Sequence, residues 1–329
     1  LIIDTTAPVV TINTLVTNDN RPPLSGTVND TTATISVLVN AQTRAAVNNG
    51  DGTWTLANDA ITPALADNTY SVVVTATDTA GNAGVDGTAS ELRVDTVAPT
   101  ISVNTLVTAD STPALTGSVG DPAAVITVVV SGQTRTATNN GNGTWTLANN
   151  SLTALPDGTY SVAATARDAA NNSRTDSTSN ELRIDTTGPV VTVNTLATRD
   201  NRPPLSGTID DTTATVSVLV GGQTRAATNN GNGTWTLAND AITPALADNV
   251  YDVAVTATDS VSNTGTDSST GELRIDTTLN VTVTALTTSD NTPALNGTVD
   301  DATATISVLV NGTTYPGSNN GNGTWTLAD

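Results

Sequence analysis

The sequence contains no cysteine, methionine, phenylalanine, histidine or lysine. Without cysteine it has no disulfide framework, and without lysine it cannot form the lysine–asparagine isopeptide bonds that rigidify some pilin-type domains. Nucleophile and base pairs are reduced to carboxylates, because histidine, cysteine and lysine are all missing. These absences predict that the protein is not an enzyme.

Positive charge is also scarce, since 31 acidic residues face only 11 arginines and the net charge is -20. Such a balance excludes nucleic acid and anionic membrane surfaces as partners and favours cations. No run of 18 apolar residues occurs, so we expect no membrane insertion of this region. Solubility in salt is the simpler explanation of the acidic composition.

What the sequence does contain is one phrase written four times. Trp54, Trp145, Trp235 and Trp325 lie 91, 90 and 90 residues apart, each within N-G-(D/N)-G-T-W-T-L-A. A fixed period of this length is typical of a tandem array of domains. We predict repeats at residues 4–94, 95–184 and 185–275, an incomplete fourth repeat at 276–329, and the end of a preceding repeat at 1–3. The chain is then a window on a longer array.

Within the first repeat, apolar residues alternate with threonine and serine, and the alternating segments are separated by turns rich in glycine and asparagine. This pattern predicts strands at residues 9–13 with 15–16, 24–28, 34–40, 43–47, 53–57, 70–77 and 89–94. We therefore expect an all-β chain of tandem immunoglobulin-like β-sandwiches, about seven strands each, in a linear array. Trp54 is predicted to be a core residue, and Tyr70 to form a tyrosine corner.

Aspartates recur at positions that the sandwich topology brings to one end of each repeat. In the first repeat they are Asp4 in the linker, Asp30 after the second strand and Asp78 after the sixth. Carboxylates gathered within roughly 5 Å repel one another unless a cation neutralises them, and oxygen ligands without histidine or cysteine favour calcium. The predicted interdomain metal ligands are Asp4, Asp30, Asp78, Asp95, Asp121, Asp168, Asp185, Asp211, Asp259, Asp276 and Asp301. The alternative is that each aspartate caps its own loop through an Asx-turn.

A second set of acids lies at the opposite end of each repeat: Asp19, Asp110, Asp200 and Asp290, together with Asp67, Asp157 and Asp248. These residues are candidates for orienting the next linker, or else for capping turns. Asp86, Asp176 and Asp267 also recur, each followed five residues later by Glu91, Glu181 or Glu272, but the pattern does not place them.

Three phrases carry a family resemblance: D-T-T-A-P-V-V-T-I at 4–12, D-N-R-P-P-L-S-G-T at 19–27 and Y-S-V-V-V-T-A-T-D-T-A-G-N at 70–82. They resemble the bacterial Ig-like repeats of giant, type I secreted, RTX-type surface adhesins. The last phrase departs from the pattern at 169–172 and 260–263. The resemblance implies an extracellular stalk on the bacterial cell surface, with calcium at the domain junctions. The domain that binds a host cell or other surface is then expected elsewhere in the protein.

Two classes of function follow. The first is an extender that projects a distal binding domain and contacts only neighbouring repeats. The second is a repeated carbohydrate- or cell-binding module, or a filament or matrix subunit. An extender predicts polar outer faces, whereas a binding module predicts an exposed aromatic or apolar patch. The incomplete fourth repeat would be covered by further residues of its own or by another chain.

Overall fold

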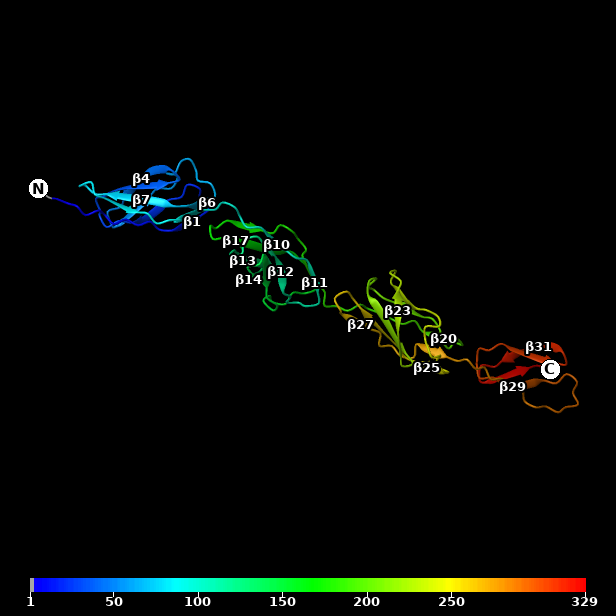
Figure 1. Ribbon diagram of the computed structural model, residues 1–329. Coiled ribbons are helices and arrows are strands. Elements are labelled where there is room, and N and C mark those ends of the chain that lie inside the picture. Colours follow the sequence, from blue (N-terminus) through cyan, green and yellow to red (C-terminus); the bar gives the residue numbers. More distant parts are fainter. Residues whose placement is uncertain (1–2) are drawn as a thin grey trace. The chain divides into compact units, whose positions relative to one another are not determined.

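The computed structural model describes residues 3–329, in which every regular element is a β-strand (Figure 1). Leu1 and Ile2, predicted to end a preceding repeat, lie outside the described residues. The chain divides into two compact units, one ending at Thr186 and the other spanning Thr187–Asp329. The described residues hold no helix of the length and apolarity that spanning a membrane requires. The predicted all-β class is confirmed.

The first repeat, in the first unit, contains two sheets with the orders β1-β9-β6 and β2-β5-β4-β3-β7-β8. Its strands are β1 (Leu15–Thr17), β2 (Leu24–Thr27), β3 (Thr34–Val39), β4 (Gln42–Asn48), β5 (Thr53–Leu56), β6 (Asn68–Tyr70), β7 (Val72–Thr77), β8 (Ala83–Asp86) and β9 (Leu92–Val94). Strand β4 connects the two halves of the larger sheet. Its residues 42–46 pair with β3, whereas Val47 and Asn48 pair with β5.

Two predicted strands of this repeat differ from those in the structure. The expected strand at 70–77 is β6 and β7, which are separated by Ser71 and belong to different sheets. The expected strand at 89–94 is shorter and follows an additional strand, β8. The physical reason is a change of sheet: β6 pairs with β9, and β7 pairs with β3. Periodicity cannot reveal such a change, because alternation continues on both sides of the break.

The core lies between the sheets and is aliphatic, with one tryptophan at its centre. Trp54 is fully buried, as are Val37 and Val74 from paired strands. The indole N–H of Trp54 donates to the carbonyl of Thr11 at 2.8 Å, so its polar atom is satisfied. Tyr70 donates its hydroxyl proton to the carbonyl of Ala66 at 2.8 Å. The predicted core tryptophan and tyrosine corner are both confirmed.

The second repeat, also in the first unit, follows the same plan with an extra strand at its start. Its strands are β10 (Ile101–Val103), β11 (Leu106–Thr108), β12 (Leu115–Val119), β13 (Val125–Val130), β14 (Gln133–Asn139), β15 (Thr144–Leu147), β16 (Gly158–Tyr160), β17 (Val162–Arg167), β18 (Ser173–Thr175) and β19 (Leu182–Ile184). The sheet orders are β11-β19-β16 and β10-β12-β15-β14-β13-β17-β18. Trp145 is fully buried in this core.

The second unit begins with the third repeat, which reproduces the first. Its strands are β20 (Leu196–Thr198), β21 (Leu205–Thr208), β22 (Thr215–Val220), β23 (Gln223–Asn229), β24 (Thr234–Leu237), β25 (Asn249–Tyr251), β26 (Val253–Thr258), β27 (Thr264–Thr266) and β28 (Leu273–Ile275). The orders are β20-β28-β25 and β21-β24-β23-β22-β26-β27.

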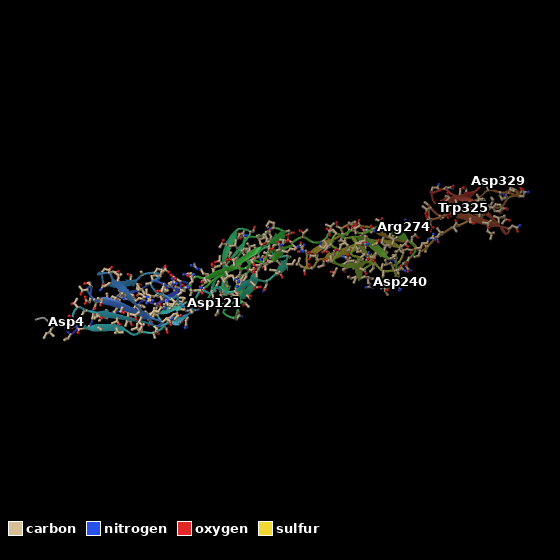
Figure 2. All side chains as sticks on the ribbon, turned by 90° about the horizontal axis from the view of Figure 1, so that it is seen from above. Asp4, Asp121, Asp240, Arg274, Trp325 and Asp329 are labelled. Carbon is tan, nitrogen blue, oxygen red and sulfur yellow. The ribbon has the colours of Figure 1, made fainter. Side chains whose placement is uncertain are left out.

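The remainder of the second unit is one sheet of four strands in the order β29-β32-β31-β30. They are β29 (Leu295–Thr298), β30 (Ile306–Val310), β31 (Thr313–Asn319) and β32 (Thr324–Leu327). Trp325 lies on β32 of this sheet (Figure 2). It is 1% exposed, whereas Val310 is 42% exposed. The buried counterpart Val220 in the third repeat is covered by β26. Among the described residues no such strand covers Val310.

Candidate functional site

The linker between the first two repeats starts with Asp95, whose amide, carbonyl and carboxylate are all hydrogen-bonded. Its amide donates to the carbonyl of Thr17 at 3.0 Å, and its carbonyl accepts from the side-chain amide of Asn172 at 2.7 Å. One carboxylate oxygen, Oδ2, accepts from Arg93 at 2.9 Å, and the other accepts from the amide of Val97 at 3.2 Å. The linker is therefore held by residues on both sides of it in the sequence.

The arginine is a partner that the sequence analysis missed. Arg93–Asp95, Arg183–Asp185 and Arg274–Asp276 form ion pairs of 2.9, 2.8 and 3.0 Å. The recurring phrase L-R-(V/I)-D contains the signal, because residues two apart in a strand project on the same face. Arg274 is 63% exposed and projects from the surface (Figure 2), so this pair contributes at most about 1 kcal/mol.

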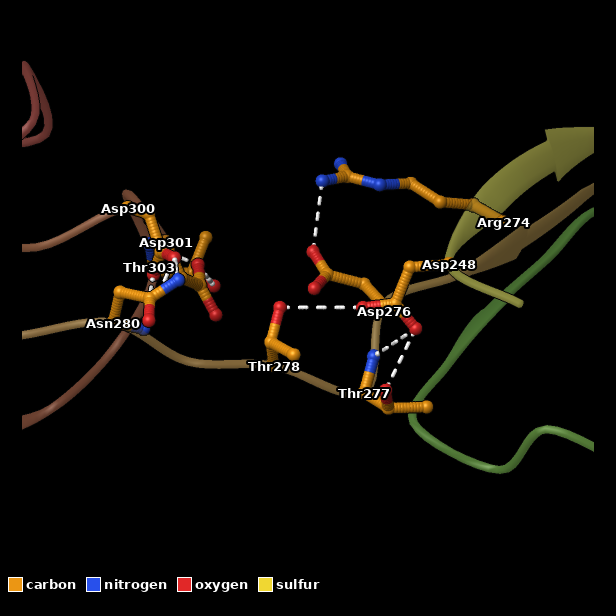
Figure 3. Close-up of polar contacts among 9 residues, drawn as sticks. All are labelled: Asp248, Arg274, Asp276, Thr277, Thr278, Asn280, Asp300, Asp301 and Thr303. Carbon is orange, nitrogen blue, oxygen red and sulfur yellow. Dashed lines mark hydrogen bonds and ion pairs between the residues drawn. The ribbon is translucent and has the colours of Figure 1, made fainter.

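Within the second set of acids, Asp19, Asp110, Asp200 and Asp290 cap their own turns by accepting from the amide two residues later. The other three, Asp67, Asp157 and Asp248, contact the residues just after a linker aspartate. Asp67 accepts from the hydroxyl of Thr96 at 2.9 Å. Asp248 accepts from the amide and hydroxyl of Thr277 and from the hydroxyl of Thr278 (Figure 3). The Thr277 hydroxyl lowers the pKa of Asp248, because it donates to the ionised form. These three acids orient the outgoing linker, which was one of the two roles considered for them.

The aspartates after the second strand of each repeat cap their own loops. Oδ1 of Asp30 accepts from the amide of Thr32 at 2.7 Å and from its hydroxyl at 2.8 Å. The hydrogen bond from the Thr32 amide has the largest effect and lowers the pKa of Asp30. The nearby Asp78 carboxylate acts in the opposite direction and raises that pKa. Equivalent loop bonds reach Asp121, Asp211 and Asp301. In each case Oδ2 accepts no hydrogen bond from the residues that the structure describes.

The aspartates after the sixth strand are more fully engaged. Asp78 accepts from the amides of Ala80 and Asn82 at 2.8 Å, and the Asn82 side chain donates to its second oxygen at 2.8 Å. That side-chain bond is the main cause of the lowered pKa of Asp78. The same Asn82 amide also donates to the carbonyl of Asp4 at 3.1 Å. Asn82 therefore connects the loop to the linker that precedes the repeat, as Asn172 does for Asp168 and Asp95.

The predicted aspartates are thus partly brought together. The Asp78 carboxylate opposes the ionisation of Asp30, and Asn82 joins the Asp78 loop to Asp4. In the last linker, Asn280 donates to Asp300, and Thr303 donates to Asp301 (Figure 3). Within residues 3–329 no three acidic side chains gather into a metal-binding group. The groups available at the linkers are carboxylate and carbonyl oxygens, which are the ligands that calcium prefers.

A further acidic residue that the sequence pattern did not place is buried in every complete repeat. Glu91, Glu181 and Glu272 are 4, 3 and 3% exposed. Oε2 of Glu91 accepts from the amide of Val72 at 3.0 Å, and its backbone carbonyl accepts from Leu15 at 2.7 Å. The recurrence of a glutamate at one register position was the only sequence signal.

These features define a protein of tandem immunoglobulin-like β-sandwiches joined by acidic, hydrogen-bonded linkers. A family model described as bacterial Ig-like domain matches residues 11–96, 100–186 and 192–277. The chain therefore belongs to the bacterial Ig-like domain family. No curated protein matches it.

Solved structures with similarity include two adhesin fragments. A Ca²⁺-stabilised adhesin with which an Antarctic bacterium binds ice is 24% identical, covering 98% of this chain and 91% of its own, with a TM-score of 0.38. A tetra-tandem repeat from the extending region of a large adhesion protein is 27% identical, covering 98% of this chain and 90% of its own, with a TM-score of 0.34.

Proposed function

We propose that this region is a non-catalytic extender of a bacterial surface adhesin, which projects a binding domain located elsewhere in the protein. The proposed repeats begin at Asp4, Asp95, Asp185 and Asp276. The observation that supports this function best is the linker residue Asp95, whose amide, carbonyl and carboxylate are each bonded to a different part of the chain. A binding module needs no such linker, whereas an extender depends on it.

The outer surface favours the same function. All four tryptophans are buried, and Tyr315, 43% exposed, is the most exposed aromatic side chain of residues 3–329. Carbohydrate-binding modules rely on exposed aromatic rings, which stack on sugars. The apolar residues Leu38, Val129 and Leu219 are 39, 36 and 44% exposed on equivalent strands, which is too isolated to form a binding patch.

Calcium at the linkers is the second part of the proposal. We infer that Asp30, with the equivalent Asp121, Asp211 and Asp301, offers Oδ2 to the ion together with the linker aspartate and the aspartate after the sixth strand. Calcium accepts irregular shells of carboxylate and carbonyl oxygens, and it would neutralise the repulsion between Asp30 and Asp78. The adhesin that binds ice is described as Ca²⁺-stabilised, which supports the choice of ion.

Removal of calcium is expected to make the chain more flexible. Small-angle scattering of residues 1–329 in calcium and after addition of a chelator should show a broader distribution of distances and a smaller mean dimension without the ion. The reason is that the carboxylates repel one another when the cation is lost. Identical scattering curves in the two conditions would contradict the calcium proposal, while leaving the extender function in place.

A matched pair of variants separates calcium binding from loop stability. Asp121→Asn should weaken calcium binding in titration calorimetry by about tenfold, because one charged ligand is lost. Asp51→Asn is the control: Asp51 lies in the turn before Trp54, and the other repeats carry asparagine there. Equal calcium affinity in the two variants would remove Asp121 from the site.

A further inference from the structure

One buried glutamate joins the two sheets of each complete repeat. The backbone carbonyl of Glu91 accepts from Leu15, the first residue of β1, and its side chain accepts from Val72, the first residue of β7. Strands β1 and β7 belong to different sheets. Glu181 makes the same pair of bonds to Leu106 and Val162, and Glu272 to Leu196 and Val253, with lengths of 2.7 and 2.9 Å in both repeats.

The topology determines how tension acts at this point. In the first repeat β1 is the first strand and β9 the last, and they pair in parallel: Leu15 with Leu92 and Thr17 with Val94. Tension on an extender pulls β1 toward the N-terminus and β9 toward the C-terminus. Parallel neighbours pulled in opposite directions slide past each other, so their hydrogen bonds are strained together and not one by one. The pairs β11–β19 and β20–β28 are parallel in the same way, although β10 precedes β11 in the second repeat.

Glu91 lies just before β9 and bonds the first residue of β1, the two strands that tension pulls past each other. Its carbonyl bonds the first amide of β1, so sliding of β1 pulls directly on the Glu91 backbone. The side chain anchors that backbone to β7 in the other sheet. A second carboxylate holds the preceding segment, because Oδ2 of Asp86 accepts from the amide of Ile12 at 2.8 Å, and Asp267 does the same for Val193.

Burial of the ionised side chain carries a desolvation cost, which hydrogen bonds to the carboxylate oppose. Oε1 of Glu91, Glu181 and Glu272 is buried and makes no hydrogen bond of adequate geometry with the described residues. Burial would raise the pKa of Glu91, but the Thr88 hydroxyl and the Val72 amide outweigh it and the pKa lies below its ordinary value. The neighbouring carboxylate of Asp86 also opposes ionisation. A charged acceptor makes a stronger bond to an amide than a neutral one, which offsets part of that cost.

We propose that Glu91, Glu181 and Glu272 are mechanical latches, which resist withdrawal of the strand that pairs in parallel with the last strand of each repeat when the chain is under tension. The proposal rests on the extender function, and it assigns to one residue per repeat the coupling between the sheared strand pair and the opposite sheet. These are positioning residues, since they act through the strands that they hold.

Single-molecule stretching of residues 1–329 by the two ends tests the latch. The wild-type chain should show three similar unfolding events, each releasing about 300 Å of chain. Glu181→Ala removes the anchor from the second repeat only, so one of the three events should move to a clearly lower force at the same pulling speed. The unaltered first and third repeats are controls within the same molecule. An unchanged set of three forces, even with reduced thermal stability, would overturn the latch.

If the second repeat of Glu181→Ala does not fold and its event is missing, Glu181→Gln decides, because glutamine keeps an acceptor for Val162. As the pH is lowered, the wild-type forces should fall when the glutamates become protonated and lose the charged acceptor. In Glu181→Gln, one event should lose this acid dependence. A parallel loss in all three repeats would assign the effect to another group. Extension of the wild-type chain without discrete events would contradict the extender function itself.

Discussion

Replacement of Trp145 by alanine is expected to unfold the second repeat. The side chain is fully buried, and its indole N–H donates to the carbonyl of Ser102 at 2.9 Å. Removing a buried tryptophan costs about 3–5 kcal/mol, because the cavity adds to the lost transfer free energy. A domain of this size has a total stability of only about 4–13 kcal/mol. Hydrogen exchange followed by mass spectrometry should show loss of amide protection in residues 95–184.

The control for this variant lies in the same repeat. Val129→Ala removes an apolar side chain that is 36% exposed, so we expect a change in unfolding free energy below about 1 kcal/mol. Protection in residues 4–94 and 185–275 should persist in both variants if the repeats fold independently. Full protection of residues 95–184 in Trp145→Ala would show that the tryptophan does not support the core as the structure indicates.

The fold could be predicted from the sequence because its signals repeat. Trp54 and Leu56 share a face at a spacing of two, and three further repeats present the same pattern. A strand predicted from one segment alone is uncertain, but the same alternation in four copies makes the assignment secure. The tyrosine corner was predictable for a similar reason, since Tyr70 follows a turn and starts a strand.

The remaining details depend on contacts between distant segments, which periodicity does not encode. Glu91 follows Val72 by 19 positions and Leu15 by 76, and nothing local marks it as buried. The sequence likewise gives no signal that residues 70–77 are divided between two sheets. For the aspartates, the topology predicted that three carboxylates meet, whereas the described residues hold no group of three acidic side chains that could bind a metal. Their role as calcium ligands stays a prediction, because charge and loop position are consistent with Asx-turns as well.

Gly26→Ala is the second substitution for which a large effect is expected. The backbone at residue 26 pairs with Trp54, and a Cβ atom there would lie 1.9 Å from the carbonyl oxygen of Thr11 and 2.7 Å from Nε1 of Trp54. These two atoms are themselves hydrogen-bonded at 2.8 Å, so neither can move without breaking the bond that satisfies the buried indole. Glycine is therefore required by close approach, and the equivalent Gly117, Gly207 and Gly297 face the same crowding.

The expected cost of Gly26→Ala is about 3 kcal/mol or more, since overpacking is combined with the loss of a buried hydrogen bond. Gly87→Ala is the matched control in the same repeat, because a Cβ at residue 87 meets no atom within 4 Å. That variant should be neutral or stabilised by up to about 1 kcal/mol through the unfolded state. Urea unfolding of the two variants, followed by far-ultraviolet circular dichroism, gives the comparison. Equal midpoints for Gly26→Ala and the wild type would mean that the segment carrying Thr11 does not lie over Trp54.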